Sequence, residues 1–184
     1  MSLKSGFITF SIMLPVITFI YGIFTMQGAV FLNSIYTILC VASFIIIHKK
    51  FPILSKQTYC AAIIFILLSM LAGRGFDFYT RILYWDKILH FSSGFIFASA
   101  GTQIYKKLKG DDKNHTLMNL FILSFSVSLA CLWEIYEFSI DNFFGTAAQN
   151  DSLSDTMWDM IMGTVSVVTV ILYNILILKK NSRH

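Results

Sequence analysis

Six long apolar stretches dominate the chain and are separated by short polar connections. They cover residues 7–24, 29–47, 57–72, 86–105, 117–138 and 155–178. A helix needs roughly 20 mostly apolar residues to cross the hydrocarbon core of a bilayer. Continuous apolar runs of this length are helical in lipid, because barrel strands are shorter and alternate in polarity. The pattern therefore predicts an all-α, polytopic transmembrane helical bundle with about six spans.

Composition supports this class and limits the domain organisation. Of the 184 residues, 56% are hydrophobic and only 13% are charged, and the mean hydropathy is +0.69. These values exclude most soluble domains and any disordered chain, both of which carry more charge. Six spans with short connections use up the whole length, so we expect a single membrane domain over residues 1–184 and no second, soluble domain.

Basic residues gather on one side of the predicted membrane. Eleven of the 14 belong to the N-terminus, the second and fourth connections and the C-terminus: Lys4, Lys49, Lys50, Lys56, Lys106, Lys107, Lys109, Lys113, Lys179, Lys180 and Arg183. The positive-inside rule places this side in the cytoplasm, together with both termini. The net charge of +4 therefore needs no nucleic-acid partner. The partner that it predicts is the lipid bilayer.

Acidic residues gather on the opposite side. Only Asp111 and Asp112 fall on the cytoplasmic side. The other eight map to the outer connections or the outer ends of spans: Asp77, Asp86, Glu134, Glu137, Asp141, Asp151, Asp155 and Asp159. Asp77 and Asp151 could equally be solvated loop residues.

Helical spacing arranges most of these acids on three faces. Glu134, Glu137 and Asp141 stand at i, i+3 and i+7 on one face of the fifth span. The pairs Asp86/His90 and Asp155/Asp159 are each spaced i, i+4, on the fourth and sixth spans. An ionisable group inside a span costs roughly 2.5–3.5 kcal/mol on insertion scales, so such groups turn inward toward partners. The spacing predicts an outward-facing carboxylate/histidine site shared by three helices.

A structural explanation competes with a functional one for each residue. A histidine such as His90 is often a satisfied interfacial residue, and Asp155 fits a helix start because Ser152 precedes it in a capping-box pattern. The set as a whole needs more, since carboxylates this close must be neutralised by protons, a bound cation or basic side chains. A purely structural charge network remains the alternative to a functional site.

Three strings carry a resemblance to a known family. They run from Tyr84 to Gly94, from Trp133 to Asp141 and from Asp155 to Asp159, with Gln149 between the last two. They resemble the YjdF-like family of bacterial inner-membrane proteins, and the Asp-Lys-x-x-His-Phe element is weakly similar to VanZ-like proteins, which are linked to glycopeptide resistance. The resemblance covers roughly residues 74–166. It implies a multi-pass protein of the bacterial inner membrane and no established activity.

The first functional hypothesis is a metal-dependent enzyme that acts on a lipid or envelope precursor at the outer leaflet. One or two divalent cations, Mg²⁺, Mn²⁺ or Zn²⁺, suit a set of carboxylates with one imidazole. The candidate ligands are Asp86, His90, Glu134, Glu137, Asp141, Asp155 and Asp159. Glu134 and His90 are also the candidate acid–base pair, and Arg74, Arg81 and Lys87 would bind an anionic lipid headgroup or small molecule.

Two other classes remain open. A transporter for a metal or a proton-coupled solute would use intramembrane carboxylates, but the cytoplasmic halves of the predicted spans hold no Asp, Glu, Lys, Arg or His. A non-catalytic sensor or membrane subunit is the third class. The one-sided placement of the acids favours the enzyme.

Overall fold

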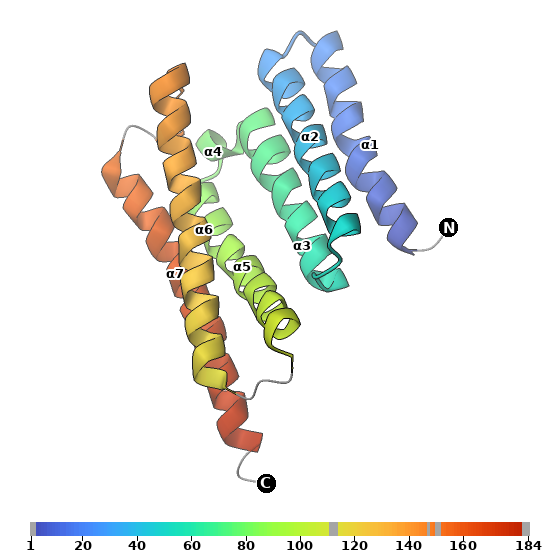
Figure 1. The fold of residues 1–184 in the computed structure, drawn as a ribbon. Coiled ribbons are helices and arrows are strands. Elements are labelled where there is room, and N and C mark those ends of the chain that lie inside the picture. The colour runs from blue at the N-terminus through green and yellow to red at the C-terminus, as the bar shows by residue number, and fades with distance from the viewer. Residues whose placement is uncertain (1–2, 111–113, 147, 150–151, 182–184) are drawn as a thin grey trace. The chain divides into compact units, whose positions relative to one another are not determined.

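The structure is a computed structural model that describes residues 3–110, 114–146, 148–149 and 152–181. All regular secondary structure in these residues is helical, which confirms the predicted all-α class (Figure 1). Some residues that enter the predictions of orientation and site lie outside the described residues, namely Asp111, Asp112, Lys113, Asp151 and Arg183.

Seven α-helices and one π-helix follow one another along the described chain. They are α1 (Leu3–Phe24), α2 (Gly28–Lys50), α3 (Lys56–Ile66), the π-helix η1 (Leu67–Gly75), α4 (Phe78–Arg81), α5 (Trp85–Lys109), α6 (His115–Phe144) and α7 (Leu153–Asn181). The predicted third span is thus divided, because its second half winds as a π-helix. Local apolar patterning does not distinguish that form from an α-helix.

Five helical segments in the described residues are long and apolar enough to cross a membrane: Gly6–Phe24, Gly28–Lys50, Lys56–Gly75, His115–Phe144 and Leu153–Ile177. Helix α5, the predicted fourth span, has 25 residues and is about 37 Å long at 1.5 Å per residue. Asp86, Lys87, His90 and the lysines of its last turn lower its hydropathy, so its crossing stays a prediction. The cytoplasmic placement of the termini also stays a prediction.

The chain divides into two compact units, Met1–Trp85 and Asp86–His184. The first unit has a buried core between α2 on one side and α3 with the start of η1 on the other, made by Val41, Ile45, Tyr59, Ile63 and Leu67. Helices α1 and α2 are joined by a buried hydrogen bond of 2.9 Å between the hydroxyls of Thr18 and Ser34. Candidate spans occur in both units, and the expected single membrane domain stays a prediction.

Helices α5, α6 and α7 form the second unit, and their ends follow from local capping. The Asn114 side chain accepts a hydrogen bond from the Leu117 N–H at 2.9 Å and begins α6. Helix α6 continues to Phe144, beyond the predicted end at residue 138. It stops at Gly145, whose φ of 65° is the left-handed conformation that favours glycine. Ser152 begins α7 by accepting from the Asp155 N–H at 3.3 Å, as the capping pattern predicts.

Small residues bring these three helices together. A Cβ atom on Gly94 of α5 would collide with the Ser166 hydroxyl and the Gly163 carbonyl of α7. A Cβ on Gly163 would lie 3.8 Å from the Ala130 side chain of α6. One to two turns further along, Ala98, Ile122 and Val167 form a buried apolar cluster. The close packing of α5, α6 and α7 fixes the side chains in the adjacent turn.

Candidate functional site

Helices α5 and α7 run in parallel and match each other turn by turn. Gly94 and Gly163 face each other at the close contact. Four residues earlier on each helix stand His90 and Asp159, and four residues earlier again stand Asp86 and Asp155. Because i and i+4 lie on the same face of a helix, the register that packs the glycines also places the charged pairs opposite each other. The packing of small residues thus positions the charged site.

Lys87 lies at the centre of the aspartates. Its ammonium forms an ion pair with Asp155 Oδ1 and lies 2.8 Å from Asp159 Oδ1 and 2.9 Å from Asp159 Oδ2. Asp86 Oδ2 is 3.7 Å away. One cation therefore serves three carboxylates. This arrangement leaves the group with an excess of negative charge.

His90 adds an imidazole to the same group and is buried. Its Nε2 atom lies 3.5 Å from Asp86 Oδ1, 3.7 Å from Glu134 Oε1 and 3.9 Å from Asp159 Oδ1. Ligand atoms of Asp86, His90 and Asp159 all lie within 4.8 Å of one another. Two donors on an octahedral cation with bonds near 2.1 Å stand about 3 Å apart. Small side-chain movements would therefore bring these three groups onto one ion.

Glu134 of α6 lies beside His90. Together with Asp86, Lys87, His90, Asp155 and Asp159 it forms a group that we call the charged layer. Glu134 is 5% exposed, and its carboxylate oxygens make no hydrogen bond of good geometry; its polar neighbours are the Gln149 side chain and His90 Nε2, which lies 3.7 Å from Oε1. A buried carboxylate that lacks close hydrogen bonds is unfavourable by several kcal/mol. Such a group in a native protein points to a ligand, a proton or a reaction that uses it.

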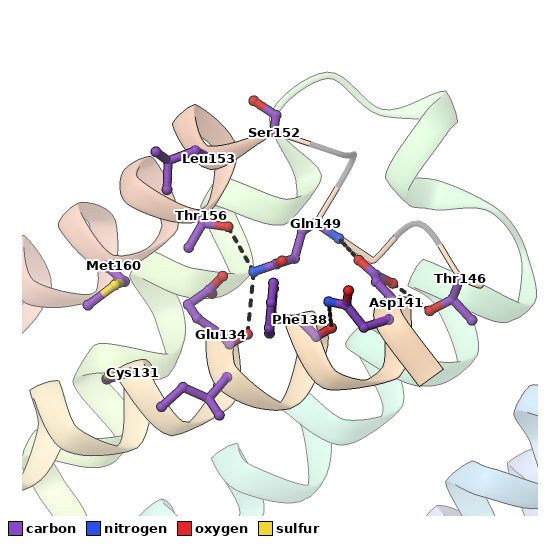
Figure 2. A pocket seen from close by; sticks show the side chains of 12 residues that line it. Cys131, Glu134, Phe138, Asp141, Thr146, Gln149, Ser152, Leu153, Thr156 and Met160 are labelled. Carbon is purple, nitrogen blue, oxygen red and sulfur yellow. Dashed lines mark hydrogen bonds between the residues drawn. The ribbon is translucent and has the colours of Figure 1, made fainter. Parts of the chain in front are cut away.

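A cavity of about 610 Å³ opens beside Glu134, between the C-terminal end of α6 and the start of α7. Figure 2 shows its lining. Its polar lining residues are Glu134, Asp141, Asn142, Thr146, Gln149, Ser152 and Thr156, and its apolar lining residues are Cys131, Ile135, Phe138, Leu153 and Met160. Glu134 thus belongs both to the charged layer and to the cavity wall.

Gln149 closes the end of this cavity above Glu134. Its side-chain amide donates hydrogen bonds to the Thr156 hydroxyl at 2.9 Å and to the Glu134 backbone carbonyl at 3.3 Å (Figure 2). The Gln149 amide therefore links α6 to α7 beside the cavity. Gln149 appears in the sequence motif, but its spacing from the acids gives no sign of this contact.

The structure does not bring all the predicted metal ligands together. Asp141 accepts hydrogen bonds from the Thr146 hydroxyl and from the N–H groups of Ala148 and Gln149, at 2.7 and 2.9 Å for the two N–H groups. It therefore anchors the connection between α6 and α7. Asp155 pairs with Lys87. Glu137 is buried on α6 but lies outside the three-residue metal-ligand group.

The predicted basic residues belong to two different units of the chain. Lys87 lies within the charged group, whereas Arg74 and Arg81 belong to the first unit. The Arg74 guanidinium stands over the Tyr79 ring at 5.8 Å. Arg81 Nε is 3.7 Å from Asp77 Oδ2, with both side chains more than half exposed. Their role in binding a headgroup stays a prediction.

One further signal in the sequence could have located the site more sharply. The strings Asp86-x₃-His90-x₃-Gly94 and Asp155-x₃-Asp159-x₃-Gly163 share the same spacing of two ionisable residues and a glycine. Two helices with this pattern can pack in parallel at the glycines and face each other with their charges. The glycine in each string identifies the contact that the acids alone do not.

Comparison with known proteins assigns the chain to a family. Residues 7–180 match DUF2238, a family described as predicted membrane proteins. The chain belongs to this DUF2238 family. An uncharacterized protein of Thermotoga maritima is 30% identical over 127 residues, which are 68% of this chain and 64% of that relative. No solved structure matches the chain.

Membership of DUF2238 supports the membrane class but names no chemistry. The matched range includes the whole charged layer and the cavity lining. The chain spans 64% of the length of its Thermotoga relative. The resemblances to YjdF-like and VanZ-like proteins stay predictions.

Proposed function

We propose that the protein is a divalent-cation-dependent membrane enzyme that hydrolyses a lipid or a lipid-linked envelope precursor. The observation that carries this proposal is the position of Glu134. Its buried carboxylate makes no hydrogen bond of good geometry, lies 3.7 Å from His90 and lines a cavity of about 610 Å³. A carboxylate that borders a cavity and lacks close hydrogen bonds is available to a ligand, which supports the proposal.

In the proposed site, Asp86, His90 and Asp159 bind one Mg²⁺, Mn²⁺ or Zn²⁺ ion. Catalytic metal sites commonly have three protein ligands and one open position for water. The mutual spacing of these three ligand atoms, within 4.8 Å, supports this set. With a cation on Asp159, Lys87 would keep Asp155 as its ion-pair partner.

Glu134 is the general base of the proposed reaction. Asp86, His90 and Asp159 would hold a cation that would activate a water molecule, and the Glu134 carboxylate would take up the proton of this water as the water oxygen bonds to the acyl carbon or phosphorus of the substrate. The bond to the leaving alkoxide breaks, and the leaving oxygen takes the proton from Glu134. The reaction consumes water alone. The cavity beside Glu134 provides the space for the substrate.

We further propose that the site faces the outer side of a bacterial inner membrane. The support is the one-sided distribution of Lys and Arg in the sequence. The site groups stand at the start of α5 and α7 and toward the end of α6. These helix ends lie opposite the lysine-rich connection between α5 and α6.

The test is lipid turnover by purified protein in nanodiscs that contain a bacterial lipid extract. Products are measured by mass spectrometry after addition of Mg²⁺, Mn²⁺, Zn²⁺ or EDTA. We expect a product that requires one of the metals, disappears in Glu134→Gln and persists in His115→Asn, a substitution of an exposed histidine at the start of α6. Absence of any product, or a product that EDTA leaves unchanged, would contradict the proposal.

A further inference from the structure

The cavity beside Glu134 changes in polarity along its length. Asn142, Thr146 and Ser152, with Leu153 beside them, stand at the end near the α6–α7 connection, and Cys131 and Met160 stand at the other end, about one turn beyond Glu134. Cys131 and Asn142 are about 16 Å apart along α6, from 1.5 Å per residue. Both helices are candidate spans, so the polar end lies toward the membrane surface and the apolar end toward its centre. A lipid in one leaflet has the same polarity gradient.

Two half-exposed side chains form part of the cavity wall on α6. Ile135 is 54% exposed and Phe138 is 59% exposed, and both line the cavity. In a spanning helix such exposed apolar side chains contact lipid. The cavity wall and the lipid-facing surface of α6 are therefore continuous, which gives a membrane-dissolved molecule a lateral route of entry.

The charge of the lining restricts the polar end of the occupant. No Lys, Arg or His lines the cavity in the described residues, and its two acidic lining residues are Glu134 and Asp141. The neighbouring layer has three aspartates around Lys87, so it adds no net positive charge. Charges of the same sign repel strongly where water is largely excluded. A headgroup with a net negative charge is therefore disfavoured in this cavity.

We propose that the cavity binds a membrane amphiphile whose acyl chain lies along the apolar end and whose headgroup bears hydroxyl or ammonium groups and no net negative charge. That this amphiphile is the substrate of the enzyme rests on the proposed function, whereas its binding in the cavity does not. Side-chain oxygens of Asn142, Thr146 and Ser152 can hydrogen-bond hydroxyl or ammonium hydrogens at the polar end.

The experiment compares three lipids with identical dioleoyl chains and different headgroup charge: dioleoylglycerol, dioleoyl dimethylammonium propane, whose protonated amine carries an N–H, and dioleoyl phosphatidylglycerol. The purified protein is incubated with an equimolar mixture in EDTA, and retained lipids are counted by native mass spectrometry. We expect the neutral and the cationic lipid to be retained about tenfold more than phosphatidylglycerol. Equal or greater retention of phosphatidylglycerol, or retention of none of the three, would overturn the proposal.

Matched variants on α6 locate the binding. Ile135→Trp narrows the cavity, whereas Leu132→Trp changes a neighbouring side chain that is 58% exposed and does not line it. We expect Ile135→Trp to lower retention about tenfold and Leu132→Trp to leave it unchanged. Equal retention by the two variants would place the lipid elsewhere and overturn the proposal.

Use of EDTA separates this test from that of the proposed function. Lipid retention as predicted without any metal-dependent turnover would contradict the enzyme and support the binding site. Metal-dependent hydrolysis of phosphatidylglycerol would support the enzyme and overturn the charge preference.

Discussion

Replacement of Lys87 by methionine tests the charge balance of the site. Methionine keeps much of the length of the side chain and removes its charge. The ammonium pairs with Asp155 and Asp159 and lies 3.7 Å from Asp86. Its loss removes the cation that the three neighbouring carboxylates share. Their mutual repulsion then acts against folding.

The magnitude follows from the burial of the partners. Removal of one partner from a buried ion pair costs roughly 3–5 kcal/mol. The Lys87 and Asp155 side chains are each 19% exposed, so water screens part of the effect. We therefore expect a loss near the lower limit, about 3 kcal/mol, or roughly a hundredfold rise in the unfolded fraction. For a chain of this size the unfolding temperature falls by about 6–12 °C.

The assay is thermal unfolding of purified protein in detergent, followed by circular dichroism. Arg81→Met is the matched control, because the Arg81–Asp77 pair is 3.7 Å long and its side chains are 71% and 56% exposed. Exposed ion pairs contribute about 0–1 kcal/mol, so the unfolding temperature of the control variant should hardly change. Lys87→Arg, which keeps the positive charge, should lose less stability than Lys87→Met.

Addition of metal gives the Lys87→Met experiment its second arm. Without the competing ammonium, a divalent cation is expected to bind the aspartates more tightly than in the wild type. At a hundred times its dissociation constant, a ligand that binds only the folded state adds about 2.7 kcal/mol. Mg²⁺, Mn²⁺ or Zn²⁺ should therefore restore most of the lost stability. A variant as stable as the wild type, or one that none of the three cations stabilises, would refute the reasoning.

Three further predictions concern other parts of the second unit. Glu134→Gln should raise the free energy of unfolding by about 1–2 kcal/mol in chemical denaturation, because it removes a buried charge that makes no hydrogen bond of good geometry, and a destabilised variant would favour a structural role. Gly94→Ala should cost about 1–3 kcal/mol in the same assay, because the new Cβ collides with Gly163 and Ser166, whereas Gly28→Ala meets nothing within 4 Å and should be tolerated. The Asp141 carboxylate accepts hydrogen bonds from N–H groups of the α6–α7 connection, so Asp141→Ala should release this connection and speed its limited proteolysis about tenfold. Unchanged cleavage would show that other contacts hold the connection.

The apolar pattern predicts most of the fold because the bilayer constrains it strongly. Long apolar runs have few structural options in lipid, so the helical class follows directly. Helix ends depend on single residues, and α6 continues past the predicted boundary to Gly145, where the left-handed conformation ends it. The π-helix Leu67–Gly75 depends on a change of hydrogen-bond register that the apolar run does not encode.

The sequence predicts which residues of the site share a helix face, but it does not predict which residues of different helices form pairs. Spacing correctly places Asp86 with His90 and Asp155 with Asp159, because i and i+4 share a helix face. It does not show that Lys87 pairs with Asp155 and Asp159, since 68 and 72 residues separate these partners along the chain. Local spacing likewise groups Asp141 with Glu134. In the structure, the Asp141 carboxylate instead accepts hydrogen bonds from N–H groups of the α6–α7 connection.

Metal content tests the central claim most directly. Wild-type protein and three variants, His90→Asn, Asp159→Asn and His115→Asn, are incubated in turn with Mg²⁺, Mn²⁺ and Zn²⁺, desalted and measured by elemental mass spectrometry. The account predicts about one metal ion per chain in the wild type and in His115→Asn, and a loss of that ion in His90→Asn and Asp159→Asn. A wild-type protein that retains none of the three metals, or variants that all retain the metal equally, would contradict it.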